Sequence, residues 1–270
     1  MLSKLGEGIY WDKVSESLLW LDILDFKLYK SIKDKVFCYQ LAEKASVILD
    51  VKKNEVYLAN ESGIIIFDLN LNTIKRVSYT PSTYDSYLYR SNDGLKLKEN
   101  IYIYGVMLNK PAKGDGALIV SNNGVGNVIY TGISIPNTFI KIPNSHSLLI
   151  TDSFDGIVYK ITFSKTWSSI ISKVKWFDLS HTETTPDGGC ISLDGRIFLA
   201  IWDGFKILEL NLDGKVIMEF EVPIPRPTNC TLNTEENKLF ITSAYEGLTE
   251  HDRQKYPMSG SIFTVDINVC

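Results

Sequence analysis

Apolar and polar residues alternate over short stretches along most of this 270-residue chain. Alternation with a period of two is typical of β-strands that bury one face. Six of these stretches recur with starts about 37 to 49 residues apart, at residues 18–21, 55–59, 100–104, 147–151, 196–201 and 238–242. Helical periodicity is nearly absent, and the nearest candidate, residues 165–174, is rich in serine and β-branched residues that disfavour helix. The pattern therefore predicts an all-β protein.

The spacing of the repeats selects among all-β architectures. A chain of this length can form a sandwich, a barrel or a propeller, and repeats of about 40 to 50 residues are typical of propeller blades. We therefore predict a six-bladed β-propeller that occupies residues 1–270 as a single domain. The last alternating stretch, residues 261–267, must then complete the blade begun near the N-terminus or close against it. Functional side chains are expected at one mouth of the central channel, where the entrances of the inner strands converge.

The stretch TPDGGCISLDGRIFLAIWDG, residues 185–204, shows how one repeat is built. Two apolar runs flank Asp194-Gly195, a pair that favours the tight turn of a β-hairpin. A second pair, Asp203-Gly204, leads into a third alternating run. Asp187 is placed differently, because it stands before the first run and ahead of two glycines. Its carboxylate is expected to project from a strand entrance toward the central space.

Composition and net charge limit the classes of partner that the protein is expected to bind. The hydrophobic fraction of 44% and the charged fraction of 22% are those of a soluble globular protein. The net charge is −4 and the basic residues are scattered, which argues against nucleic-acid binding. No apolar run approaches the roughly 20 residues that cross a bilayer, and the first residues carry no signal-like segment. We expect a cytoplasmic protein with no membrane partner, and the oligomeric state stays open.

Cysteine and histidine residues show no spacing typical of a metal or nucleophile site. The histidines are far apart in sequence, and no nucleophile elbow or phosphate-binding loop is present. The four cysteines also contain no CxxC pair: Cys38, Cys190, Cys230 and Cys270. Buried or idle thiols are therefore expected, rather than a disulfide or a metal site.

Several segments together resemble one known family. The opening LGEGIYWDKVSESLLWLDI is similar to the first blade of the gluconolactonase, regucalcin (senescence marker protein) and luciferin-regenerating enzyme family. Three further segments occur in the family's order: RSNDGLKLKENIYIYGVM at 90–107, IPNTFIKIPNSHSLLITDS at 135–153 and TPDGGCISLDGRIFLAI at 185–201. The terminal KLFITSA and GSIFTVDI fit its closing blade. The resemblance covers almost the whole chain and agrees with the six-bladed interpretation.

The resemblance implies a metal site. Its metal-binding positions fall on Glu7, Asn137 and Asp187, which would hold one divalent cation in the channel. Carboxylate and amide oxygens suit Ca²⁺ or Mg²⁺, and the set would also accept Zn²⁺ or Mn²⁺. We expect Ca²⁺. Taken singly, Glu7 could instead be a solvated side chain near the terminus, and Asn137 a turn residue after proline.

The resemblance also implies substrate contacts. The family's R-x-N-D-G motif matches Arg90, Asn92 and Asp93, whose side chains can donate to or accept from ester and hydroxyl oxygens. A plain turn is the alternative for this motif. Lys110 takes the place of a glutamate that contacts substrate in some members, a charge reversal that favours a more anionic ligand. Thr138 replaces a usual glycine after the asparagine, which predicts a different backbone angle there.

These inferences lead to one preferred function. We expect a metal-dependent lactonase-type hydrolase that acts on a small-molecule lactone or related carboxylic ester. The cation would polarise the carbonyl oxygen, and Asp187 would be both a ligand and the candidate general base. The alternatives are a non-enzymatic propeller that binds a divalent cation or small metabolite, and a propeller that binds proteins through its rim.

Overall fold

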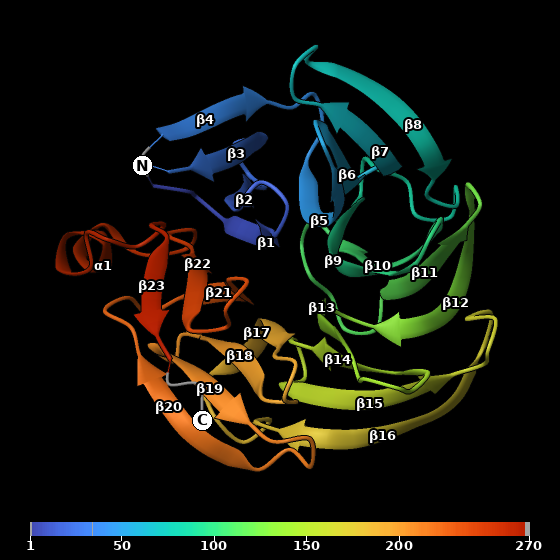
Figure 1. Cartoon of the computed structure of the whole chain (residues 1–270). Helices are drawn as coiled ribbons and strands as arrows, with labels where there is room; N and C mark the ends of the chain where they lie inside the picture. The colour runs from blue at the N-terminus through green and yellow to red at the C-terminus, as the bar shows by residue number, and fades with distance from the viewer. Residues whose placement is uncertain (1, 34, 268–270) are drawn as a thin grey trace.

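The computed structural model describes residues 2–33 and 35–267. Nearly all of these residues lie in or between β-strands, which form six antiparallel sheets around a common centre (Figure 1). Each sheet is one blade, and its strands follow one another in sequence from the centre of the ring to its rim. The predicted six-bladed β-propeller is confirmed.

The first half of the chain forms blades 1 to 3. Blade 1 contains β1 (Gly6–Asp12), β2 (Ser17–Asp22), β3 (Lys27–Ile32) and β4 (Lys35–Gln40). Blade 2 contains β5 (Ala45–Lys52), β6 (Glu55–Asn60), β7 (Gly63–Asp68) and β8 (Thr73–Tyr79). Blade 3 contains β9 (Tyr89–Lys98), β10 (Ile101–Leu108), β11 (Gly116–Asn122) and β12 (Val125–Ile133).

The second half forms blades 4 to 6. Blade 4 contains β13 (Pro136–Lys141), β14 (Ser147–Asp152), β15 (Ile157–Phe163) and β16 (Ile170–Asp178). Blade 5 contains β17 (Thr185–Ile191), β18 (Ile197–Trp202), β19 (Lys206–Leu210) and β20 (Val216–Glu221). The described part of blade 6 contains β21 (Pro227–Leu232), β22 (Lys238–Ser243) and β23 (Phe263–Asp266), with the short helix α1 (Glu250–Lys255) between the last two.

The six recurring stretches found in the sequence are the second strands of the blades, β2, β6, β10, β14, β18 and β22. A second strand has a hydrogen-bonded neighbour on each side and packs against another blade on each face, so most of its residues are buried. This double burial explains why the second strands give the strongest apolar signal. In the weak helix candidate at 165–174, residues 165–169 instead form a turn and residues 170–174 are the start of β16.

The core is divided among the junctions between blades. Each junction holds a separate apolar cluster with residues from both neighbours. Between blades 3 and 4, for example, Ile103 and Leu118 pack with Phe139 and Ile150. Because burial of apolar area is the main stabilising term, the positions of neighbouring blades are fixed mostly by these clusters.

The ring closes where blade 6 meets the N-terminal segment. The strand β23 pairs with β22, while β1 begins its own blade, so of the two predicted closures the chain uses the second. Leu5 forms a β-bridge with Ala244, and the Thr228 hydroxyl donates to the Gly6 carbonyl. Trp11 of β1 stacks on a phenylalanine of β22 with ring centroids 5.4 Å apart. A backbone bridge, a side-chain hydrogen bond and an aromatic contact thus join blade 6 to the N-terminal segment.

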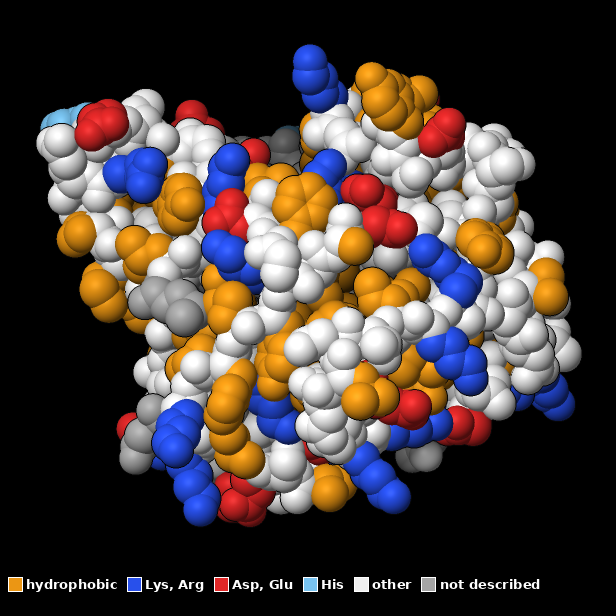
Figure 2. Space-filling model, turned by 90° about the horizontal axis from the view of Figure 1, so that it is seen from above, with side chains coloured by type: hydrophobic (Ala, Val, Ile, Leu, Met, Phe, Trp, Pro, Cys, Tyr) orange, Lys and Arg blue, Asp and Glu red, His pale blue; other side chains and the backbone are white. Residues whose placement is uncertain are grey.

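The surface agrees with the dispersed charge of the sequence. On the face seen in Figure 2, lysine and arginine side chains are spread among acidic and hydrophobic ones rather than gathered in one stripe. Within the described residues, no helix has the length and apolar character needed to cross a membrane.

Candidate active site at one mouth of the channel

A β-bulge interrupts the inner strand of each blade that carries a predicted site residue. Within a bulge the two strands lose their one-to-one pairing, and a side chain can be redirected out of the normal alternation. The interruptions lie between Glu7 and Tyr10, Ser91 and Gly94, Asn137 and Ile140, and Pro186 and Gly189. Asp187 thus lies within β17, not ahead of its first strand as the sequence suggested. The bulges turn these side chains into the bore.

Close packing around the bulges explains their glycines. Gly8 has φ +55°, and a Cβ there would lie 2.7 Å from the carbonyl oxygen of Ser46 on blade 2. At Gly188 a Cβ would lie 2.2 Å from the Cγ of Asn229 on blade 6. A larger residue at position 8 would meet the backbone of blade 2, and one at position 188 would displace the Asn229 side chain. The glycines of the Gly-Glu-Gly and Asp-Gly-Gly sequences therefore allow close packing of neighbouring inner strands.

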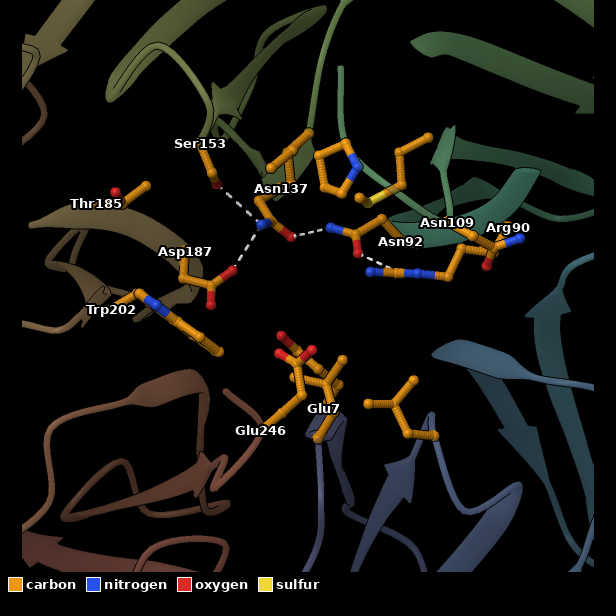
Figure 3. Close-up of a pocket in the computed structure, with 15 residues that line it drawn as sticks. Glu7, Arg90, Asn92, Asn109, Asn137, Ser153, Thr185, Asp187, Trp202 and Glu246 are labelled. Carbon is orange, nitrogen blue, oxygen red and sulfur yellow. Dashed lines mark hydrogen bonds between the residues drawn. The ribbon is translucent and has the colours of Figure 1, made fainter. Parts of the chain in front are cut away.

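A chain of hydrogen bonds connects the motif of blade 3 to blades 4 and 5 (Figure 3). The Arg90 Nη1 donates to Asn92 Oδ1 at 2.5 Å, and Asn92 Nδ2 donates to Asn137 Oδ1 at 2.6 Å. The Nδ2 of Asn137 then donates to Asp187 Oδ1 at 2.6 Å and to Ser153 Oγ at 2.9 Å. The chain holds one carboxylate oxygen of Asp187 in place.

Like charges meet at the centre of the channel. Burial, with a smaller contribution from the charge of Asp93, raises the pKa of Glu7 to about 8. Burial also raises the pKa of Asp93 to about 7. The pKa of Asp187 lies well above its usual range because of burial and the charges of Glu7 and Asp93, although Arg90 and the hydrogen bond from Asn137 oppose the shift. The site therefore strongly favours a bound positive charge.

The donor chemistry of the site fits a hard cation. Glu7, Asn137 and Asp187 are buried, and all three line one cavity of about 340 Å³. Among residues 2–33 and 35–267, no group of three or more His, Cys, Asp and Glu side chains is arranged to hold a metal. The predicted set is not a group of this kind, because its third donor is the side-chain amide of Asn137. In the structure the Nδ2 of that amide donates to Asp187 Oδ1, and its Oδ1 accepts from Asn92 Nδ2. Oxygen donors near mutually repelling carboxyl groups suit Ca²⁺ or Mg²⁺ better than a thiophilic metal.

Comparison with known proteins identifies the family of the chain. The family model for the SMP-30/Gluconolactonase/LRE-like region matches residues 5–245. The chain belongs to this family. Regucalcin from Xenopus laevis is 22% identical over 97% of this chain and 90% of its own length. The 6-deoxy-6-sulfogluconolactonase of Pseudomonas putida is also 22% identical, over 99% of this chain and 92% of its own.

Solved structures confirm the fold. The calcium-binding protein regucalcin from Agrobacterium tumefaciens superimposes with a TM-score of 0.92. The match covers 99% of this chain and 91% of that chain, at 21% sequence identity. At this level of identity the likeness establishes the propeller fold only. The chemistry of the site must be inferred from the residues of this chain.

Two of the predicted substrate-binding residues, Asp93 and Lys110, do not line the cavity that contains Glu7, Asn137 and Asp187. Asp93 faces a second cavity of about 320 Å³ further along the channel, together with Thr138 and Asn229. Lys110 is exposed and does not line the first cavity, whereas its neighbours Asn109 and Pro111 do. Arg90 and Asn92 are the members of the predicted substrate set that the structure brings to Glu7, Asn137 and Asp187.

The wall of the cavity contains residues that sequence motifs did not reveal. Glu246 follows β22, and its side chain lies near that of Glu7 in Figure 3. Ser153 directly follows β14 and bonds to Asn137. Apolar side chains complete the lining: Leu5, Leu24, Met107, Pro111, Ile135 and Trp202. Four of these eight residues lie in loops after second strands: Leu24, Pro111, Ser153 and Glu246. Their position in the family's blades, rather than their residue type, would have been the signal.

Proposed function

We propose that the protein is a metal-dependent hydrolase of lactones or related esters. The observation that carries the proposal is the convergence of Glu7, Asn137 and Asp187 in a cavity that also contains Arg90 and Asn92. Lactonase names among the relatives support the reaction class, and the calcium-binding regucalcin supports Ca²⁺ as the cation. Glu7, Asn137 and Asp187 would hold the cation, which when bound lowers the pKa of the carboxyl groups and polarises a carbonyl oxygen.

The residues of the chain divide the remaining work. Arg90 offers guanidinium N–H groups, and Asn92 is held rigid by its bonds to Arg90 and Asn137. Together they orient the ring of the substrate. Asp187 accepts a proton from the attacking water as the water oxygen bonds to the acyl carbon. The same proton passes to the ring oxygen when the C–O bond breaks, so that the product is a hydroxy acid.

The cavity also indicates which lactones are accepted. Its apolar wall, with Trp202, Met107 and Leu24, offers surface to an alkyl or aryl face. Three carboxyl groups, those of Glu7, Asp187 and Glu246, line it against a single arginine. A bound divalent cation would bring the total near neutrality. We therefore propose neutral lactones as substrates in preference to the anionic ligands that the sequence suggested.

Metal analysis combined with a hydrolysis screen tests the proposal. The purified protein would be stripped with a chelator, reloaded with Ca²⁺, Zn²⁺, Mn²⁺ or Mg²⁺ and assayed on sugar lactones, aliphatic lactones and aryl esters. The substitution Asp187→Ala should lower kcat/KM at least about a hundredfold. The matched control Asp213→Ala removes an exposed aspartate in the turn before β20 and should leave the rate unchanged.

Two results would contradict the proposal. Tight cation binding without hydrolysis of any compound in the screen would identify the protein as a non-enzymatic binding propeller. An unchanged rate in folded Asp187→Ala would remove this carboxylate from the mechanism.

A further inference from the structure

Two cysteines that are 40 positions apart in sequence meet at the junction of blades 5 and 6. Cys190 lies in β17 and Cys230 in β21, the inner strands of the two blades. Their Sγ atoms are 3.8 Å apart, and both thiols are free. The two strands belong to different sheets, so no backbone ladder joins them at this point. The separation is close to van der Waals contact, and a modest movement would bring the sulfurs to bonding distance, about 2 Å.

The pair opens onto the channel away from the candidate active site. Both cysteines line the second cavity, while neither lines the first. Cys190 is half-buried, whereas Cys230 is only 2% exposed. A small reagent in the channel therefore reaches Cys190 first, and Cys230 is held beside it without direct contact with bulk solvent.

We propose that Cys190 and Cys230 are a redox pair that forms a reversible disulfide and fastens blade 5 to blade 6. A small disulfide such as oxidised glutathione supplies the oxidant. The Cys190 thiolate attacks one sulfur of the oxidant, forms a mixed disulfide and expels one thiolate. Cys230 then attacks the Cys190 sulfur and expels the second. The two cysteine protons end on the two released thiols, and the two electrons reduce the oxidant.

The surroundings of the pair decide its rate and its effect. Burial and the neighbouring thiol raise the pKa of Cys190, so little thiolate is present at neutral pH and exchange is slow. The bond would close a 40-residue loop that contains most of blade 5. It would also brace Asn229, which precedes Cys230 and whose Nδ2 donates to Glu7 Oε2 at 3.4 Å. A fastened junction is therefore expected to resist unfolding.

Peptide mapping after oxidation tests the proposal. The full chain would be incubated with oxidised glutathione near pH 8.5, where exchange is faster, then alkylated and digested without reduction. We expect a peptide pair joined through Cys190 and Cys230, a Tm raised by about 5 °C, and reversal of both by dithiothreitol. Cys38 is exposed and serves as an internal control, because it should become glutathionylated in the same sample.

Two variants make the result decisive. In Cys230→Ala, glutathione should remain on Cys190, because no second thiol is present to displace it. In Cys190→Ala, Cys230 should stay reduced, and neither variant should show the rise in Tm. The proposal is overturned if Cys38 reacts while Cys190 and Cys230 both remain alkylatable. It is also overturned if the wild-type chain retains glutathione on Cys190, since Cys230 would then fail to reach it.

Discussion

Thr138 tests whether a strained backbone is maintained by its side chain. The residue lies in the bulge of β13 with φ 77°, in the region that favours glycine, and it is 2% exposed. Its hydroxyl donates to the carbonyl of Asp187 on the next blade and lies 2.5 Å from the Thr151 hydroxyl. The backbone angle costs about 1–2 kcal/mol for a residue with a side chain. Loss of the hydroxyl would remove a hydrogen-bond partner from two buried groups, the Asp187 carbonyl and the Thr151 hydroxyl, at a cost of about 1–3 kcal/mol each.

These terms predict an order of stability for three substitutions. Thr138→Ser keeps the hydroxyl and should lie within about 0.5 kcal/mol of the wild type. Thr138→Gly also loses the hydrogen bonds, but it removes the strain while it gains entropy in the unfolded chain, so its net loss should be smaller than that of Thr138→Val, about 1–5 kcal/mol. Thr138→Val keeps the strain and loses the bonds, for a loss of about 2–6 kcal/mol.

Urea unfolding and thermal melting would measure this order directly. Each kcal/mol corresponds to about 2 °C in Tm for a chain of this length. A Thr138→Gly protein as stable as the wild type would show that relief of strain outweighs the bonds. A Thr138→Val protein indistinguishable from the wild type would show that the hydroxyl contributes nothing, and the reasoning would fail at its central step.

Three further predictions concern the channel and its mouth. With chelator present, Tm should fall as pH rises from about 6 to about 8.5. The reason is that Glu7 and Asp93 have raised pKa values, so the native state binds protons that the unfolded chain releases in this pH range. The substitution Glu7→Gln should reduce the slope of Tm against pH. Lys110→Ala should change KM for lactones less than about twofold, whereas Arg90→Met should raise it about tenfold, in steady-state assays of both variants. Trp202→Ala should raise KM about tenfold for lactones with an alkyl or aryl face and much less for small lactones. An equal rise in KM for both kinds of lactone would contradict an apolar subsite.

The parts of this fold that could be predicted are those that depend on the local pattern of apolar, polar and turn-forming residues. The double burial of each second strand produced six apolar stretches, and their spacing gave the number of blades. The hairpin at Asp194-Gly195 likewise follows from turn chemistry alone. The resemblance then named Glu7, Asn137 and Asp187, and the structure places all three at one cavity.

The remainder depended on tertiary geometry that no local pattern records. Asp93 and Asn92 are adjacent in the sequence, yet the bulge sends one toward the second cavity and the other toward the first. Lys110 lies between two lining residues, yet it is exposed and does not line the cavity. The approach of Cys190 to Cys230 depends on how blades 5 and 6 pack. Because bulges redirect side chains by one position, neighbours in a motif cannot be assigned to the same site from their order alone.

The bulges also explain why the site exists only in the closed ring. Blade 1 supplies Glu7, blade 3 supplies Asn92, blade 4 supplies Asn137 and blade 5 supplies Asp187, so no single blade or adjacent pair contains the donor set. The bulge of blade 2 carries Ser46 instead, which bonds to Ser91 at 2.6 Å beside the substrate motif. Like charges at the axis oppose closure, while apolar clusters at the junctions favour it. A cation bound at the axis would remove the opposing term, so binding and completion of the ring should stabilise one another.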